Sequence, residues 1–131
     1  MVYTFRMSKR KEDFVTGEIY HCYNRGVEKR DIFTTKDYFD YFEKICILFN
    51  NTVSYGGMKE TLYNKNANHH NTKALVSVLA YCINPNHFHL ILRQEEEDGI
   101  SKFMQKVGTG YTMYFNKQEE RSGSLFQGKF K

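Results

Sequence analysis

The sequence predicts an α+β protein with the ferredoxin-like arrangement, in which a four-stranded antiparallel sheet carries two helices on one face. Two segments have apolar residues at spacings of three and four, which predicts helices, and four shorter segments alternate in the manner of strands. Their order is β-α-β-β-α-β, the ferredoxin-like order, which places the first and third strands side by side in the centre of the sheet. A length of 131 residues suits one such domain.

The first half of the chain supplies a strand and a helix. Residues 17–25 (GEIYHCYNR) predict the first strand, with Ile19, His21, Tyr23 and Arg25 on one face and Tyr20, Cys22 and Asn24 on the other. Gly26 permits the turn that follows. The apolar spacing predicts a helix over residues 36–50, with Thr34 or Thr35 as its N-cap.

The second half supplies a hairpin, a helix and a last strand. Residues 74–84 (ALVSVLAYCIN) predict a strand, and a turn at Pro85 joins it to the strand that begins at His87. The second helix follows an acidic loop and contains Gly108 and Gly110, which we expect where another backbone or a ligand comes close. Residues 124–131 (SLFQGKFK) predict the short fourth strand.

Two further segments complete the predicted organisation. Residues 1–16 are expected to form a loose basic arm, and residues 17–131 the domain. Residues 52–73, rich in Asn and containing Gly56-Gly57, are expected to form a loop insertion. His69 and His70 lie in this insertion, and we interpret them as a solvated pair because adjacent loop residues do not converge on one ion.

Composition limits the function without fixing it. A net charge of +4 and a pI near 8.9 are compatible with nucleic acid but too modest to imply it. Ten Tyr without any Trp favour a surface that stacks or forms hydrogen bonds, although compositional bias is an equal alternative. Cys22, Cys46 and Cys82 form no C-x-x-C pair, so we expect buried reduced thiols. No run of membrane-spanning length or signal peptide occurs, which predicts a soluble cytoplasmic protein.

A His-x-His pair occupies the predicted third strand. His87 and His89 share one face, whereas Phe88, Leu90 and Leu92 point to the core. Two neutral imidazoles on one face can bind one divalent ion, although paired strand histidines are also common as half-buried polar residues. Because this strand lies beside the first one, the pair is expected to join the polar residues of that strand in one site.

Several motifs together resemble the tyrosine transposases of the HUH class. The segments are YHCYNRGVEKRDIF, NPNHFHLIL, YTMYFNK and GSLFQGKFK, and the similarity runs from Gly17 to Lys131 around the insertion. Within that class, the motifs look like those of the REP-associated and insertion-sequence-type single-strand transposases. The resemblance implies a bacterial, nucleoid-associated enzyme with a ferredoxin-like fold that cuts and rejoins single-stranded DNA, often beside a hairpin. It also implies that His87 and His89 bind Mg²⁺ or Mn²⁺, and that a tyrosine forms a 5′-phosphotyrosine link.

One departure from the family concerns the nucleophile. In the family it lies on a helix that follows the segment matched here by LFQGKFK, and an amide-type third metal ligand lies one turn later. The sequence ends at Lys131, so the resemblance implies a domain truncated before that helix and inactive alone. Within the chain we consider Tyr114 as a substitute, because Tyr111 falls on the apolar stripe of the second helix. Gln127 is an amide in a predicted strand and is not assigned as a ligand.

DNA contacts are expected from basic and stacking residues near the site. The predicted set is His21, Tyr23, Asn24, Arg25, Lys29, Arg30 and Lys129. Tyr23 and Asn24 are expected on or beside the open sheet. Lys102 and Lys117 are interpreted as a solvated helix face. The apolar last strand leaves an edge that predicts a homodimer.

The competing hypothesis is a nucleic-acid-binding module without chemistry, such as a domesticated or decayed mobile element. RNA-recognition domains share this element order and stack bases on aromatic residues of the sheet. In this sequence His87 and His89 stand where those aromatic residues would be, which favours the transposase hypothesis. A metal requirement would distinguish the two.

Overall fold

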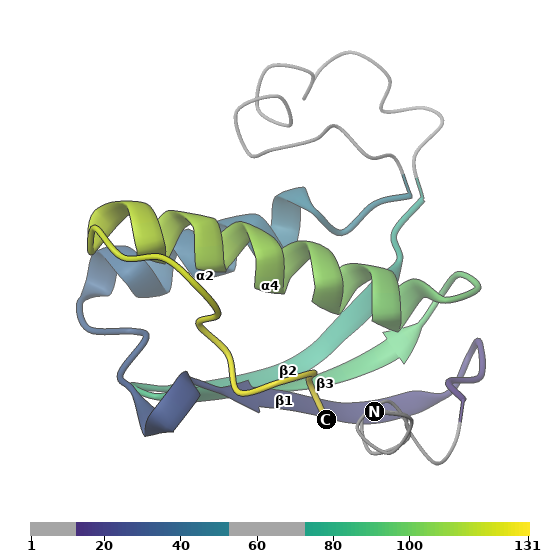
Figure 1. The fold of residues 1–131 in the computed structure, drawn as a ribbon. Helices are drawn as coiled ribbons and strands as arrows, with labels where there is room; N and C mark the ends of the chain where they lie inside the picture. The colour runs from purple at the N-terminus through teal and green to yellow at the C-terminus, as the bar shows by residue number, and fades with distance from the viewer. Residues whose placement is uncertain (1–12, 53–72) are drawn as a thin grey trace.

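A computed structural model describes residues 13–52 and 73–131 as one sheet covered on one face by two helices (Figure 1). The elements are β1 (Ile19–Arg25), a short 3-10 helix η1 (Val27–Lys29), α2 (Lys36–Leu48), β2 (Val76–Asn84), β3 (His87–Gln94) and α4 (Gly99–Gln118). The predicted α+β class and the helix layer are therefore confirmed. Most of the predicted arm and of the 52–73 insertion, including His69 and His70, lies outside the described residues.

The sheet has the strand order β1-β3-β2, and all neighbouring strands are antiparallel. The central strand is β3, as the buried pattern of its sequence requires. Its register places His87 opposite Arg25 of β1 and Asn84 of β2, and it places His89 opposite Tyr23 and Cys82. Polar residues from three strands thus form adjoining rows at one end of the sheet.

A regular fourth strand is not confirmed. Residues 124–131 run along the outer edge of β1, but they form only a single β-bridge, Gly26 with Phe126, in the described part of the chain. Further along, Tyr23 and Lys131 exchange two backbone hydrogen bonds of 2.7 Å. Gly128 lies between these contacts with a φ of 72°. This left-handed residue bends the segment away from the ladder, so pairing is interrupted.

The core lies between the sheet and the helices. Along β3 the alternation buries Phe88, Leu90 and Leu92 against the helices. The helices contribute Phe42, Ile45, Phe103, Val107 and Tyr111, all of which are almost completely buried. The Tyr111 hydroxyl donates a hydrogen bond to the Ile32 carbonyl, which confirms a structural position for this tyrosine. In the described ranges we find no helix long and apolar enough to cross a membrane.

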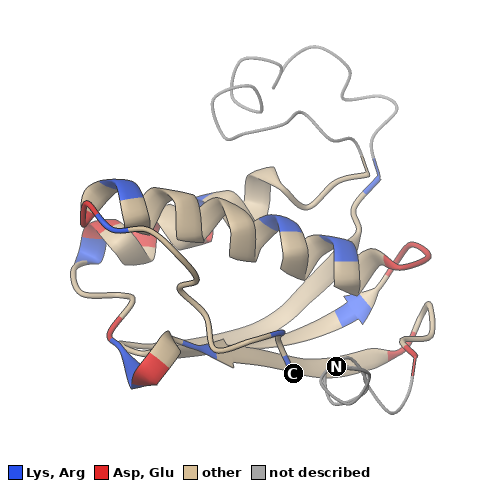
Figure 2. Ribbon diagram, in the orientation of Figure 1, with Lys and Arg blue, Asp and Glu red and all other residues tan. Residues whose placement is uncertain are grey.

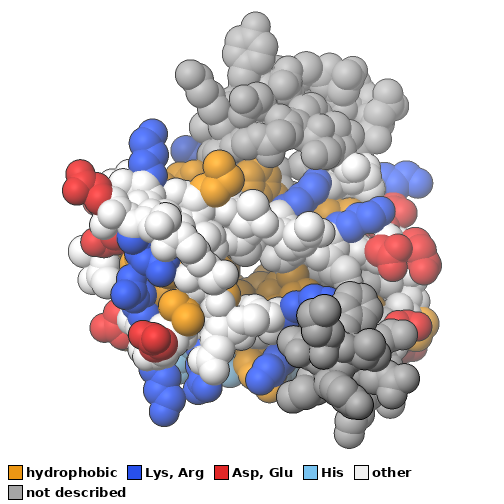
Figure 3. All heavy atoms as spheres, in the orientation of Figure 1, with side chains coloured by type: hydrophobic (Ala, Val, Ile, Leu, Met, Phe, Trp, Pro, Cys, Tyr) orange, Lys and Arg blue, Asp and Glu red, His pale blue; other side chains and the backbone are white. Residues whose placement is uncertain are grey.

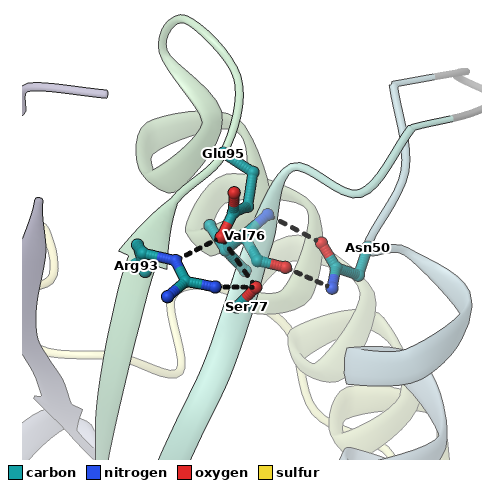
Figure 4. Close-up of polar contacts among 5 residues, drawn as sticks. All are labelled: Asn50, Val76, Ser77, Arg93 and Glu95. Carbon is teal, nitrogen blue, oxygen red and sulfur yellow. Dashed lines mark hydrogen bonds and ion pairs between the residues drawn. The ribbon is translucent and has the colours of Figure 1, made fainter. Parts of the chain in front are cut away.

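The end of α2 is joined to the start of β2 by a single side chain (Figure 4). Asn50 Oδ1 accepts hydrogen bonds of 3.0 Å from the backbone amides of Leu75 and Val76. Its Nδ2 donates to the Val76 carbonyl at 2.8 Å. These contacts satisfy backbone groups at the beginning of β2 that no neighbouring strand reaches. Asn50 therefore fixes where the sheet begins relative to the helix layer.

The two glycines of α4 have different surroundings. A Cβ atom at Gly110 would lie 2.6 Å from Cε2 of the buried Phe49 ring, so this glycine allows the two helices to approach closely. A Cβ atom at Gly108 would meet nothing within 4 Å. The expectation of a close approach is thus correct for Gly110, whereas Gly108 faces open space.

These surroundings predict opposite effects of the same substitution. Gly108→Ala should raise the free energy of unfolding by up to about 1 kcal/mol, because alanine is the better helix former. Gly110→Ala gains the same propensity but must displace Phe49, so it should be less stable than Gly108→Ala by about 1–3 kcal/mol. Urea unfolding followed by circular dichroism measures both, and equal stabilities would contradict the proposed helix contact.

Candidate metal centre and nucleic-acid interface

The helix-free face of the sheet carries a cluster of three histidines and one tyrosine. His87 and His89 project from β3, and His21 and Tyr23 project from β1, in the alternation that the sequence predicts. The buried neighbours Cys22, Phe88 and Leu90 point to the opposite, helix-covered face. The structure thus brings His21 and Tyr23 together with His87 and His89, although the two pairs are separated by more than sixty positions in the sequence.

His21 and His89 are in direct contact. His21 Nε2 lies 2.8 Å from His89 Nδ1, and the two rings stack with their centroids 5.0 Å apart. The Tyr23 ring lies 4.8 Å from His21 and 5.4 Å from His89. When His89 Nδ1 donates its proton to His21, the lone pair of His89 is on Nε2 and is available to an ion.

His87 is oriented by two asparagines of the hairpin. Its Nδ1 lies 2.7 Å from Asn86 Oδ1, and Asn86 Nδ2 donates to the Lys29 carbonyl at 3.4 Å. Because the Asn86 oxygen is the end that faces His87, the proton of His87 is on Nδ1. The lone pair is therefore on Nε2, where Asn84 Nδ2 lies at 3.1 Å. We did not predict these roles for Asn84 and Asn86 from the sequence. The signal was their position on either side of Pro85, directly before the His-x-His pair.

The imidazoles of His87 and His89 supply two possible ligands for a divalent ion. The rings of His87 and His89 are 5.0 Å apart and nearly perpendicular, and each can present an Nε2 lone pair. Across the described ranges, no group of three or more His, Cys, Asp or Glu side chains is arranged to hold a metal. Any ion at this site would therefore have two imidazole ligands and would take its remaining ligands from other atom types.

The environment keeps His89 in its neutral form. Partial burial lowers the pKa of His89 below its usual 6.5, and the neighbouring imidazoles of His21 and His87 lower it further. A neutral imidazole is the form that binds a metal. At neutral pH, His89 would therefore need no deprotonation to bind an ion.

Basic residues adjoin the same end of the sheet (Figure 2). Gly26 N donates to the Asn86 carbonyl at 2.9 Å, which holds the loop after β1 beside the start of β3. A Cβ atom at Gly26 would collide with the Arg30 carbonyl, so the tight turn requires glycine. Exposed Lys29 and Arg30 lie in this loop. Arg25 faces the open side, and its Nε donates to Gln127 Oε1 at 3.0 Å.

Two predictions made from the sequence are corrected by these positions. Asn24 was expected on or beside the open sheet, but it faces the helix layer, because β1 alternates. There it donates to the Gly128 carbonyl at 3.2 Å and borders a hollow of about 700 Å³ between α4 and the C-terminal segment (Figure 3). Cys82 was expected to be buried, but it is exposed on the open face. Cys22 is buried, and burial raises the pKa of the Cys46 thiol to about 12.

The remaining predicted residues lie farther from the histidines. Lys129 is exposed on the C-terminal segment beside the hollow. Tyr114 lies in the helix layer, where its ring stacks on Tyr41 at 3.6 Å. Both helices cover one face of the sheet (Figure 1). The histidines alternate with the β3 residues that are buried on that face, so they lie on the other one. The structure therefore does not bring Tyr114 to the histidines of its own chain.

Comparison with known proteins identifies the family. A family model described as "Transposase IS200 like" matches residues 45–131, which is more than half of the chain. The chain belongs to the IS200-like transposase family. Comparison with curated protein sequences gives no significant match.

Two solved structures resemble this transposase chain in fold. One is a REP-associated tyrosine transposase bound to a REP hairpin, with a TM-score of 0.58 and 12% identity over 95% of this chain and 60% of that one. The other, assigned as a transposase from Deinococcus radiodurans R1, has a TM-score of 0.55 and 14% identity over 94% of this chain and 82% of that one. The transposase chain thus spans little more than half the length of the first structure.

The surroundings of His89 predict its titration. In the metal-free transposase, the NMR titration midpoint of His89 should lie below 6.5, because burial and the neighbouring imidazoles of His21 and His87 oppose its protonation. His21→Gln removes one of those titratable neighbours and should raise the midpoint, while burial keeps it below 6.5. A midpoint at or above 6.5 in the unsubstituted protein would contradict the described contact.

Proposed function

We propose that this transposase domain binds single-stranded or hairpin DNA and holds a divalent cation, Mg²⁺ or Mn²⁺, for cutting and rejoining that DNA. The observation that carries the proposal is the placement of His87 and His89. Their rings are 5.0 Å apart on the open face of the sheet, directly beside the basic loop that follows β1. The family membership and the hairpin bound by the first structural neighbour support a DNA substrate.

Each group around the site has a proposed role. The cation, held by His87 and His89, would polarise the scissile phosphate as a Lewis acid. His21 accepts the Nδ1 proton of His89 and so keeps that ring turned toward the ion. Arg25, Lys29 and Arg30 bind phosphates, and Tyr23 offers a ring on which an unpaired base can stack.

The proposed reaction is a transesterification. A tyrosine hydroxyl attacks the phosphorus atom and loses its proton, and the bond from phosphorus to the 3′ oxygen breaks. The products are a free 3′-OH and a 5′-phosphotyrosine, which retains the bond energy for rejoining. If Tyr114 is that tyrosine, it must act on DNA held by another copy of the chain, since it lies in the helix layer of its own.

Metal binding provides the first test. Mn²⁺ titration by calorimetry should show binding to the wild-type chain and a loss of at least tenfold in affinity for His87→Ala/His89→Ala. Tyr41→Phe, on the opposite layer, is the matched control. Equal affinities for all three proteins would reject the metal site and leave a non-catalytic DNA-binding module.

The covalent step is tested with a hairpin DNA labelled at its 3′ end, because the fragment that carries this end is the one that would become linked to the tyrosine. A metal-dependent adduct that disappears in Tyr114→Phe identifies that tyrosine as the nucleophile. An adduct that persists assigns the chemistry to a different tyrosine. Metal binding without an adduct would show that this chain holds the ion and DNA but does not itself carry the nucleophile.

The basic loop predicts a specific salt dependence. Arg25→Gln, Lys29→Gln and Arg30→Gln should each weaken binding of single-stranded DNA and reduce the slope of log affinity against log salt by about 0.7, the value for one phosphate contact. Lys129→Gln tests the C-terminal segment in the same way. Lys102→Gln and Lys117→Gln lie on the solvated face of α4 and should change neither quantity. If the substitutions in the basic loop and those on α4 weaken DNA binding equally, the attraction is nonspecific.

Homodimerisation through the C-terminal segment remains part of the proposal. One edge of this segment already pairs with β1, which leaves its outer edge for a second copy. Light scattering that shows a monomer at high concentration would remove this part.

A further inference from the structure

We propose that Asn84 supplies a third protein ligand to the divalent cation, through its side-chain amide oxygen. The inference deepens the proposed function and rests on it, since it concerns the same His87–His89 site. It assigns a role to a hairpin residue that is neither a histidine nor a carboxylate.

The hairpin places the Asn84 amide at the lone pair of His87. The antiparallel register of β2 and β3 pairs Asn84 directly with His87, and both half-buried side chains lie on the open face. Asn84 Nδ2 is 3.1 Å from His87 Nε2, the nitrogen that carries the lone pair. A side chain in contact with the coordinating atom of one ligand is close enough to supply a second ligand to an ion bound there.

The distance suits two ligands of one metal. Mg²⁺ binds its ligands at about 2.0–2.1 Å in octahedral geometry, so adjacent ligand atoms are separated by about 3 Å. Asn84 Nδ2 and His87 Nε2 are already 3.1 Å apart in their hydrogen bond, so the amide group stands at about this separation before any ion binds. The 2.8 Å hydrogen bond between His21 Nε2 and His89 Nδ1 leaves no lone pair on His89 Nδ1 for the ion.

Metal binding requires the amide to turn. Without an ion, the Asn84 N–H group donates to the His87 lone pair. An ion at that lone pair would repel the N–H hydrogens, whereas rotation of the amide by 180° brings Oδ1 to the same position. The other contact of Asn84 Nδ2 is a 3.6 Å interaction with Cys82 Sγ, which is too weak to prevent this rotation.

The chemistry of the site favours an oxygen from Asn84 over the other neighbours. Mg²⁺ and Mn²⁺ prefer oxygen ligands, so two imidazoles alone make a poor site for them. Cys82 is also adjacent, opposite His89, but a thiolate selects softer ions such as Zn²⁺. A neutral amide completes the site without cancelling the charge of the ion, which remains available to a phosphate.

The test compares Asn84→Ala, Asn84→Asp and the control Asn116→Ala by Mn²⁺ calorimetry, with thermal unfolding to verify folding. We expect Asn84→Ala to lose about tenfold in affinity. Asn116, in the helix layer, has no assigned role in binding, so Asn116→Ala should bind as the wild type does. Asn84→Asp should bind Mn²⁺ at least as tightly as the wild type, because a carboxylate oxygen is a stronger ligand.

The aspartate variant separates a ligand from a positioning residue. If Asn84 only donates a hydrogen bond to His87, aspartate cannot replace it, and Asn84→Asp will bind as weakly as Asn84→Ala; that result overturns the inference. Unchanged affinity in Asn84→Ala overturns it as well. Failure of His87→Ala/His89→Ala to weaken binding is a separate outcome, because it rejects the whole metal site.

Discussion

The alternation of side chains along β3 is the constraint on which the rest of this structure depends. Phe88, Leu90 and Leu92 are buried against the helices, and the intervening His87 and His89 must therefore face the helix-free side. A slip of one residue in register would exchange the two sets and would expose the core. The free energy of burying this apolar face fixes the register of the strand, and the register in turn determines the face on which the histidines lie. Packing on one side of the strand thus sets the geometry of the site on the other.

The immediate neighbours of the histidines complete that geometry. Asn86 determines which nitrogen of His87 carries the proton, and His21 provides a partner for Nδ1 of His89. These contacts come from the hairpin turn and from β1, so each ring is held by an element that also pairs with β3. Such preorganisation reduces the cost of arranging the ligands when an ion binds. The same contacts hold both rings in fixed orientations, which a pair of solvated histidines would not have.

The sequence was sufficient for the features that follow from periodicity. The two helices, three of the strands and the common face of His21, Tyr23, His87 and His89 were predicted correctly, since burial dictates each pattern. The fourth strand was not confirmed, because the bend at Gly128 depends on a single left-handed residue that periodicity does not report. Asn24 was assigned to the wrong side, although its parity in β1 already indicated the helix face. The contacts of Asn84 and Asn86 depend on three-dimensional pairing, which residue types alone do not specify.

The two ends of β3 differ in how the charges on the open face are paired. At the far end, Arg93 is paired with Glu95 at 2.6 Å, and Ser77 also donates to that carboxylate at 2.8 Å (Figure 4). At the histidine end, Arg25 is held by the neutral amide of Gln127 and so keeps its full charge. Glu28 and Asp31 lie in the neighbouring loop, but the ion pairs found among the described residues involve neither of them. Of the two arginines on this face of β1 and β3, the one without an ion pair to any described residue is therefore Arg25 beside His87, where a phosphate would have to lie to reach the proposed ion.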